Sequence, residues 1–567
     1  MNLLIKDNFL RMGVLCIILL IGMSIRAYHT ETYVYGTDQI MHMQMSDAKS
    51  VGEVWQFSTN EIHPPLGYII RYFWLKISHS SVWMHTLGYL CDAITILLFY
   101  LIGNKLEPGC GLFAALLGAL CPIMVNMAQM IRNYSIFLMF LTACLYGYLQ
   151  FMEKRDGKWL FFYTVTAGLA AATHFSAMIP LTAMGSITLY TLFRERNWRM
   201  MALWMGADGI VGLLLLFFYL QISWTLFAVA LTKTSFIDNL KNISQELISV
   251  PIYYPPIFLP NFIDQMSAFL RDHRLSNTII NDGTKLLFVF LVYPAIAKLY
   301  KTHKLFFQIT ILSVITFFIL CLFQYDNTVP RHNMWLAPFI IVPSGMRLYQ
   351  LREKSVTIFT PALKIKLYHL MVIWLSVSTI LIPFNENEYR KSEEAMIGSE
   401  MDQWHQYVDD HVKSGDIVVG GRSAIMLFYY YILGRNYYRD LPTLNDKSYY
   451  TNNHMDIRSI LMRATDDAER AYISPAYEYK LMSIDDFDMF FNNIIAKGWL
   501  KDTHNIWFIK LIDADERLAQ RLANCPKLQS EIKYKFAYPE EQLLFFALPK
   551  ADLLEVIKPD GRFHSCL

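Results

Sequence analysis

The sequence predicts a polytopic α-helical membrane protein that carries a smaller α/β domain toward its C-terminal end. Of its 567 residues, 54% are hydrophobic and only 17% are charged, and the mean hydropathy is +0.28. Soluble domains average about 45–50% apolar and about 25% charged residues. The net charge of +2 does not indicate nucleic-acid binding, because the basic residues fall in short loops between apolar runs.

The apolar runs predict about eleven transmembrane helices. A span needs about 20 mostly apolar residues, and somewhat shorter or longer runs are tolerated. The first run lacks a small-residue cleavage site after Arg26-Ala27-Tyr28, which favours an uncleaved membrane helix over a signal peptide. The predicted spans are 12–28, 83–103, 110–127, 134–152, 159–175, 177–193, 201–231, 285–300, 304–323, 333–349 and 367–384.

Lysine and arginine collect in every alternate loop, and this asymmetry predicts the orientation. Examples are the loops at 154–158, 194–199, 298–304 and 347–366. Short basic loops lie on the cytoplasmic side of membrane proteins. We therefore expect a multi-pass protein of the plasma (inner) membrane, with a cytoplasmic N-terminus and a periplasmic or extracellular C-terminal domain.

Composition divides the chain into a membrane domain at 1–384 and an extracytoplasmic domain at 385–567. In the first exterior loop, the amphipathic stretch from Leu66 to Ile77 is predicted to form a helix in the membrane interface. In the tail, short apolar runs are typical of buried strands, and they alternate with helical patterns such as 400–412, which indicates a small α/β domain. The predicted strands are Ile417-Val-Val, Asn505-Ile-Trp-Phe-Ile and Leu543-Leu-Phe-Phe-Ala-Leu.

Polar residues that could take part in binding or catalysis lie at the predicted exterior ends of the spans. An ionisable group at membrane depth is costly and is therefore a candidate functional residue. A single arginine is equally well explained as an interfacial anchor, and an aspartate after Gly36-Thr37 as a turn residue. The whole set favours a site, because this side should be poor in positive charge. Its members are Asp38, His63, Gln129, Arg132, Tyr134, His174, Arg331 and His332.

A carboxylate that faces arginines and histidines at the outer surface suits group transfer from a lipid phosphate. Arginine forks match phosphate oxygens bidentately, and cationic groups stabilise a departing phosphate. Asp38 would act as a general base on an acceptor hydroxyl. The sequence shows no Gly-rich phosphate loop, no Ser-His-Asp arrangement, no His-Glu-x-x-His motif and no metal-ligand spacing among its eight cysteines.

Short motifs around the candidate site residues resemble those of the GT-C glycosyltransferases. The resemblance rests on Asp38 after the first span, His63-Pro-Pro-Leu-Gly-Tyr before the second, and Ala128-Gln-Met-Ile-Arg-Asn-Tyr-Ser at the start of the fourth. Thr173-His174-Phe175 and Val329-Pro330-Arg331-His332 are also similar to that superfamily. The nearest members are bacterial relatives of protein O-mannosyltransferases and of the lipid A aminoarabinose transferase (glycosyltransferase families 39 and 83), and the resemblance covers about residues 10–350.

The resemblance implies an inverting transferase that uses a polyprenyl-phosphate sugar of the undecaprenyl-phosphate type. It implies Asp38 as the catalytic base, and His63, Arg132 and Arg331 as contacts of the donor phosphate. The acceptor would be an extracytoplasmic glycan, lipid or protein. Further residues are predicted to line the site: Glu61, Gln129, Tyr134, His174, His332 and Asp92.

Two departures from the family pattern bear on metal binding. Relatives often have Asp-Glu in the first loop, whereas this chain has Asp38-Gln39. Relatives also often carry a glutamate within the Gln-x-x-Arg-x-Tyr stretch, where this chain has Met130, and Glu61 offers partial compensation. Because Gln39 is neither a base nor a charged ligand, a divalent metal is in doubt, no metal site is predicted, and Asp38 remains the only acid of the pair.

Two other classes of protein fit part of the pattern. A transporter or flippase for lipid-linked sugars would also use a basic cavity, but it should show charges at mid-depth in the membrane and repeated halves, and the sequence shows neither. A non-catalytic scaffold in envelope assembly would use the tail as its binding module, but it would not need Asp38 together with the cationic set. We expect the tail of an active transferase to position the acceptor, by analogy of fold.

Overall fold

The computed structural model describes most of the N-terminal 353 residues and short segments of the tail. The described ranges are 2–28, 37–58, 63–233, 294–323 and 334–353, with residues 30, 35 and 291–292, and in the tail 355–357, 364–366, 406–407, 410–411, 416–420, 460–464, 471–473, 505–511, 534–537 and 542–549. The chain forms two compact units. The helical unit contains Met1–Glu31 and Val54–Glu388, and the sheet unit contains Thr32–Glu53 and Tyr389–Leu567. The predicted domains 1–384 and 385–567 stay predictions.

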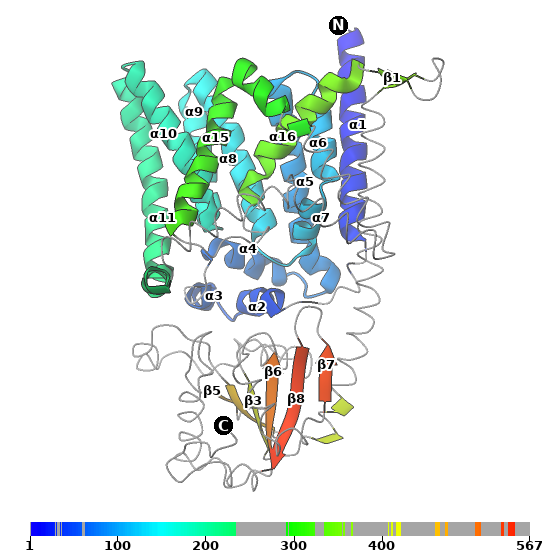
Figure 1. Ribbon diagram of the computed structural model, residues 1–567, viewed down its shortest axis with the longest axis vertical. Helices are drawn as coiled ribbons and strands as arrows, with labels where there is room; N and C mark the ends of the chain where they lie inside the picture. The colour runs from blue at the N-terminus through cyan, green and yellow to red at the C-terminus, as the bar shows by residue number, and fades with distance from the viewer. Residues whose placement is uncertain are drawn as a thin grey trace, which may run out of the picture. The chain divides into compact units, whose positions relative to one another are not determined.

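The helical unit is built from long apolar helices (Figure 1). Within the described ranges, five helices are long and apolar enough to cross a membrane, and a bent pair brings the number to as many as six. The prediction of a polytopic helical protein is confirmed, and the predicted span at 367–384 lies outside the described residues. The helices are α1 (Asn2–Ala27), α5 (Ser81–Leu106), α6 (Gly111–Ala119), α7 (Pro122–Gln129), α8 (Tyr134–Lys154), α9 (Gly157–Ala171), α10 (Met178–Arg194), α11 (Trp198–Lys233), α15 (Lys304–Phe323) and α16 (Ala337–Gln350).

One predicted span, 110–127, is broken in the structure. It divides into α6 and α7, whose axes differ by 57°. The break falls at Leu120-Cys121, directly before Pro122, which is the first residue of α7. Proline has no backbone N–H to continue a helix and is favoured at the first helical position. The chain therefore stops one helix and starts another at this point.

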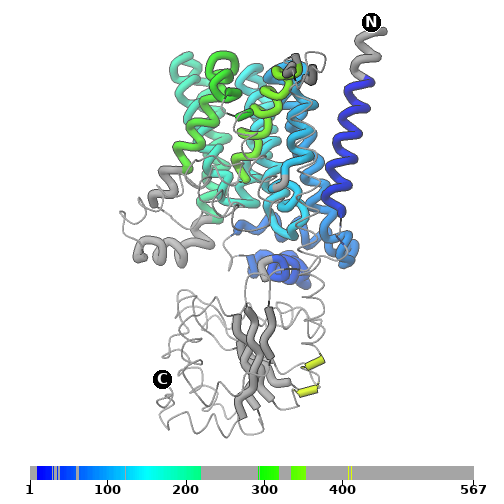
Figure 2. Tube along the Cα trace, turned by 45° about the vertical axis from the view of Figure 1, so that its right-hand side comes forward, coloured from blue at the N-terminus to red at the C-terminus, as the bar shows by residue number. Residues whose placement is uncertain are grey.

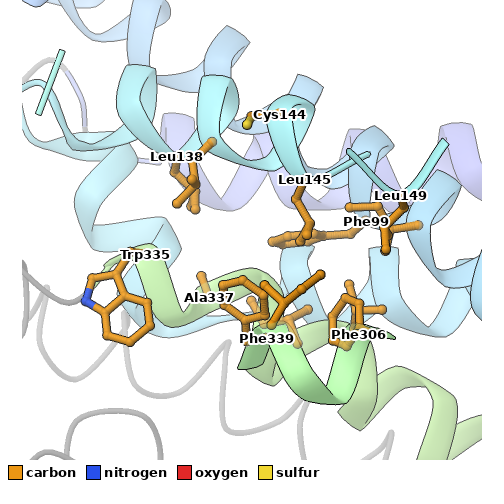
Figure 3. Close-up of a cluster of buried hydrophobic side chains, with 14 of the residues drawn as sticks. Phe99, Leu138, Cys144, Leu145, Leu149, Phe306, Trp335, Ala337 and Phe339 are labelled. Atoms are coloured by element: carbon orange, nitrogen blue, oxygen red, sulfur yellow. The ribbon is translucent and has the colours of Figure 1, made fainter. Parts of the chain in front are cut away.

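Helix α8 lies at the centre of the helical unit, and α1 and α11 lie at its edges (Figures 1 and 2). In the most apolar stretch of α8, 72% of the residues are buried, against 22% in α1 and 17% in α11. Figure 3 shows Leu145 and Leu149 of α8 beside Phe99 of α5, Phe306 of α15 and Phe339 of α16. The exposed apolar faces of α1 and α11 suit contact with lipid.

Small residues allow neighbouring helices to approach closely. A Cβ atom at Gly345 of α16 would lie 2.6 Å from the backbone of Ala114 in α6. A Cβ atom at Gly88 of α5 would lie 2.3 Å from the carbonyl oxygen of Ala128 in α7. Association of helices in membranes depends on such close packing, because burial of apolar surface gives little driving force in lipid.

A buried ion pair holds the end of α1 against α5. The Arg26 guanidinium pairs with the Asp92 carboxylate, and the two side chains are 0% and 1% exposed. Arg26 also donates to the carbonyl oxygens of Ala119 at 2.8 Å and Gly118 at 3.2 Å, at the end of α6. One side chain therefore joins three helices.

Three helices form in the loop between α1 and α5: α2 (Thr37–Ser46), α3 (Val51–Ser58) and α4 (Leu66–Leu75). Helix α4 corresponds to the predicted interfacial helix. The backbone N–H of Leu66 donates to the carbonyl oxygen of Ala172 at 3.0 Å, after the end of α9. At the other end of α4, the rings of Trp74 and Trp83 stack at 4.5 Å, and each indole N–H donates to the other residue's carbonyl oxygen at 2.9 Å. Helix α4 is thus fixed at both ends.

The tail contains a six-stranded mixed sheet. The strands β3 and β6 are parallel, and all other neighbours are antiparallel, in the order β5-β4-β3-β6-β8-β7. The three predicted strands form as β3, β6 and β8, and residues 406–407 and 410–411 of the predicted helix at 400–412 are helical. A separate two-stranded pair, β1 (Ser355–Thr357) and β2 (Lys364–Lys366), belongs to the helical unit. The strands of the sheet are β3 (Asp416–Gly420), β4 (Ile460–Ala464), β5 (Ala471–Ile473), β6 (Asn505–Leu511), β7 (Tyr534–Ala537) and β8 (Gln542–Pro549).

The Arg26–Asp92 pair yields a stability prediction. Asp92→Ala leaves a buried guanidinium without its carboxylate, which we expect to destabilise the helical unit by about 3–5 kcal/mol. Thermal unfolding of the purified protein in detergent would measure the loss. The double variant Arg26→Met with Asp92→Leu removes both charges and should recover most of it. An Asp92→Ala protein as stable as the wild type would contradict this role.

Candidate functional site

Four of the residues predicted from the sequence meet at one place in the helical unit. The His63 ring lies 4.9 Å from the His174 ring and 6.4 Å from the Tyr134 ring, measured between centroids. The Tyr134 and His174 rings are 5.5 Å apart, and the Arg132 guanidinium lies 5.4 Å from the centroid of the Tyr134 ring. We call His63, Arg132, Tyr134 and His174 the histidine–arginine cluster. It joins the segment before α4, the turn before α8 and the end of α9.

His174 is held in one orientation by the backbone around it. It caps the short helix η2 (Phe175–Ala177), and its Nδ1 atom accepts a hydrogen bond from the Ser176 N–H at 3.1 Å. The ring packs on Phe137 at 5.1 Å and is buried. In neutral histidine one ring nitrogen is an acceptor and the other carries the proton. His174 therefore presents Nε2–H as a fixed donor.

Arg132 lies in the turn between α7 and α8. Its side chain is only 8% exposed, and its position beside the ring of Tyr134 is that of a cation–π contact. Arginine is the cation best suited to this position, because its planar group can stack on a ring and still present N–H donors at its edge. The turn thus holds a positive charge in a largely buried environment.

Arg71 belongs to the same region, and the sequence motifs did not reveal it. It lies on α4, is 3% exposed, and donates through Nη1 to the Asn133 Oδ1 atom at 3.4 Å. Burial lowers the pKa of the Arg71 guanidinium to about 10, and the nearby charge of Arg132 contributes in the same direction. An arginine in an interfacial helix is expected to extend toward water, so its sequence context did not predict that Arg71 is buried. The available signal was that Arg71 is the only charged residue of α4.

Asn133 connects Arg71 to the turn that holds Arg132. It precedes α8 directly but does not cap that helix with its side chain, which is directed to Arg71 instead. A Cβ atom at Gly67 would lie 2.3 Å from both Cγ and Oδ1 of Asn133. The absence of a side chain at Gly67 therefore leaves the space that the Asn133 amide occupies.

Two predicted site-lining residues have structural partners. Gln129 donates through Nε2 to the carbonyl oxygens of Arg26 at 3.1 Å and Tyr28 at 3.5 Å, which joins the end of α7 to the end of α1. Asp92 is buried in its pair with Arg26. These contacts account for the burial of both side chains, and a direct role in a site stays a prediction.

The remaining predicted residues are not placed relative to the cluster. Glu61, Arg331 and His332 lie outside the described residues. Asp38 is the second residue of α2, in the sheet unit, and its side chain is also outside the described part. Within the described part, no three His, Cys, Asp or Glu side chains come together as a metal site.

Comparison with solved structures defines the class of the fold. The chain is similar to ArnT from Cupriavidus metallidurans bound to undecaprenyl phosphate, with a TM-score of 0.50 and 10% identity over 94% of this chain and 98% of that one. The apo form of the same ArnT gives a TM-score of 0.49 at 10% identity, over 96% and 98% of the two chains. The oligosaccharyltransferase of Archaeoglobus fulgidus, in complex with Zn and sulfate, gives 0.46 at 10% identity, over 95% and 75%. No curated protein sequence matches the chain.

The protein is a membrane protein whose fold is similar to that of ArnT, which is the GT-C type of fold that its motifs predicted. More particularly, residues 62–224 match the family described as dolichyl-phosphate-mannose-protein mannosyltransferase. Every residue of the histidine–arginine cluster lies in this matched segment, together with Arg71 and Asn133.

The contact between Gly67 and Asn133 yields a second prediction. Replacing a helical glycine by alanine is ordinarily stabilising by about 0.4–1 kcal/mol where the backbone permits it. Here Gly67→Ala should cost about 1–3 kcal/mol, because the new methyl group overlaps the Asn133 side chain. In the Asn133→Ala background the overlap disappears, and Gly67→Ala should be neutral or stabilising.

Thermal unfolding of the four proteins gives a double-mutant cycle in which the two sites are coupled. Gly67→Ala with the same effect in both backgrounds would show that Asn133 does not occupy this space.

Proposed function

We propose that the protein is an inverting glycosyltransferase that transfers a sugar from a polyprenyl-phosphate donor to an extracytoplasmic acceptor hydroxyl. The observation that carries the proposal is the convergence of His63, Arg132 and His174 from three separate segments. The match of residues 62–224 to a lipid-phosphate-dependent mannosyltransferase family supports it. So does the fold of ArnT, whose structure contains undecaprenyl phosphate.

The donor phosphate would be held by groups that can only donate hydrogen bonds to it. Arg132 offers a planar fork of N–H donors, and His174 offers Nε2–H. His63, half-buried beside His174, would be a further contact, and Arg331 is proposed as a fourth. As the bond from the sugar to the phosphate breaks, negative charge grows on the leaving phosphate. Fixed donors in a poorly solvated site stabilise this charge more than water does.

Asp38 would be the base that activates the acceptor. Its carboxylate takes the proton of the acceptor hydroxyl, whose oxygen attacks the anomeric carbon from the face opposite the phosphate. One C–O bond forms, the bond to the phosphate oxygen breaks, and polyprenyl phosphate leaves with inversion of configuration. Asp38 is in the first turn of α2. The N-terminus of a helix favours a negatively charged side chain, which is the form a base requires.

The acceptor would be a glycan, a lipid or a protein on the extracytoplasmic side. In this proposal the N-terminus is cytoplasmic, and the tail at 385–567 helps to position the acceptor. Gln39 follows Asp38 where relatives often carry an acid, so the proposed reaction uses the carboxylate of Asp38 without a metal ion.

The role of Asp38 can be tested by Asp38→Asn. Loss of the base should reduce transfer by about 10²–10⁴-fold. Transfer can be followed by release of polyprenyl phosphate in native membranes, which supply both donor and acceptor. Asp47→Asn, just after the end of the same helix, is the control and should leave transfer unchanged.

Mass spectrometry of lipids that co-purify with the Asp38→Asn protein should identify the trapped donor. Full transfer by this variant would exclude Asp38 as the base. A wild-type protein without turnover in such membranes would favour a scaffold or a flippase.

The role of His63 is tested by donor affinity. A hydrogen bond to a charged group contributes about 1.5–3 kcal/mol, so His63→Ala should weaken binding of polyprenyl phosphate by about ten- to a hundredfold. His79→Ala is the matched control, because His79 is an exposed histidine of the same exterior loop. Titration of the purified protein with polyprenyl phosphate would measure both. Equal affinity in the two variants would remove His63 from the phosphate site.

A further inference from the structure

Two arginines of the helical unit are almost equally buried but have very different partners. Arg26 is 0% exposed and is bonded to the Asp92 carboxylate and to backbone carbonyls, including that of Ala119 at 2.8 Å. Arg71 is 3% exposed, and its hydrogen-bond partner is the Asn133 amide, at 3.4 Å. In the described part of the chain, the Arg71 Nε atom has no hydrogen-bond partner, and no carboxylate pairs with Arg71.

A buried guanidinium without an anion is unfavourable. Buried charges are normally paired, because removal from water costs several kcal/mol that only a counter-charge recovers. Arg26 follows this rule. Arg71 does not, and the charge of Arg132 nearby makes its environment still less favourable for a cation. A negative charge bound beside Arg71 would therefore stabilise this arrangement.

Asn133 supplies a second buried donor at the same place. Its side chain is 2% exposed, and Oδ1 accepts from Arg71. This bond fixes the orientation of the amide, which leaves Nδ2 as a donor. Among the described residues, Nδ2 has no partner.

The helix that follows Asn133 adds to this positive environment. Helix α8 begins at Tyr134 and runs for 21 residues. Backbone N–H groups at a helix N-terminus favour a bound anion. The guanidinium of Arg71, the amide of Asn133 and the start of α8 therefore lie together and offer donors only.

We propose that Arg71 and Asn133 form an anion-binding pocket that takes the phosphate of the lipid-linked donor beside Arg132. The inference rests on the proposed function for the identity of the anion. It adds two residues to the phosphate contacts predicted from the sequence, one from α4 and one from the turn before α8. The phosphate would give Arg71 the counter-charge that Arg26 has in Asp92.

Arg71→Met separates this role from a structural one. Methionine has a similar length and no charge. If Arg71 binds an anion and has no counter-charge without it, the ligand-free Arg71→Met protein should unfold at the same temperature as the wild type or higher. The reason is that the substitution removes an uncompensated charge. If Arg71 is a structural residue, the variant should unfold at a lower temperature. The measurement uses the full-length protein in detergent, after removal of co-purified lipid has been verified by mass spectrometry.

The binding measurement uses polyprenyl phosphate and, separately, inorganic phosphate. Polyprenyl phosphate should raise the unfolding temperature of the wild type, and Arg71→Met should weaken its binding at least tenfold. Asn133→Ala should weaken it in the same direction. Arg71→Lys keeps the charge without the fork and should show a smaller loss of affinity. Arg26→Met is the matched control and should lower stability with unchanged affinity in the folded protein.

The outcomes separate the two proposals. Unchanged affinity in Arg71→Met, or a lower unfolding temperature without ligand, overturns the pocket while a wild-type response to polyprenyl phosphate upholds the donor class. A wild type that responds to inorganic phosphate but not to polyprenyl phosphate, with the response lost in Arg71→Met, supports an anion pocket and overturns its assignment to the donor. A wild type that responds to neither overturns both.

Discussion

The arrangement of the helical unit depends on one buried ion pair, Arg26 with Asp92. This pair fixes the end of α1 against α5 and, through the Ala119 carbonyl, against the end of α6. The carbonyl of Arg26 then accepts from Gln129, the last residue of α7. The turn that carries Arg132 follows within three residues. The backbone of Arg26 is therefore linked through Gln129 to the turn that carries a cation proposed to bind the donor.

The segments around the histidine–arginine cluster are held with similar firmness. Helix α4 is bonded to the end of α9 at Leu66 and clamped to α5 by Trp74 and Trp83. His63 lies three residues before the start of α4, and Arg71 lies on α4. Side chains on such supported elements keep their geometry better than side chains on free loops. The cluster thus has the fixed geometry that its proposed role, stabilisation of a leaving phosphate, requires.

The sequence predicted what depends on long apolar runs and missed what depends on tertiary pairing. The spans at 134–152 and 304–323 coincide closely with α8 and α15, because about 20 apolar residues have few alternatives in a membrane. The convergence of His63, Arg132 and His174 followed from their places at the same predicted side. The pairing of Arg26 with Asp92 joins residues 66 positions apart, and the burial of Arg71 depends on what packs over α4. Neither the ion pair nor the burial of Arg71 produces a local sequence pattern from which it could be predicted.

The proposed base, Asp38, and the proposed phosphate contacts lie in different units of the chain, and this separation has a physical reason. A carboxylate next to Arg71 would pair with it and compete with a phosphate for the same donors. In the described part of the helical unit, carboxylates pair with Arg26, Lys105 and Arg155, among other cations, and none pairs with Arg71. Asp38 instead belongs to the segment Thr32–Glu53, which groups with the tail in the sheet unit. The residue proposed to activate the acceptor is thus built into the unit proposed to position that acceptor, and the phosphate contacts are built into the helices. In the proposed reaction, the activation of the acceptor and the binding of the donor phosphate therefore belong to different units of the fold.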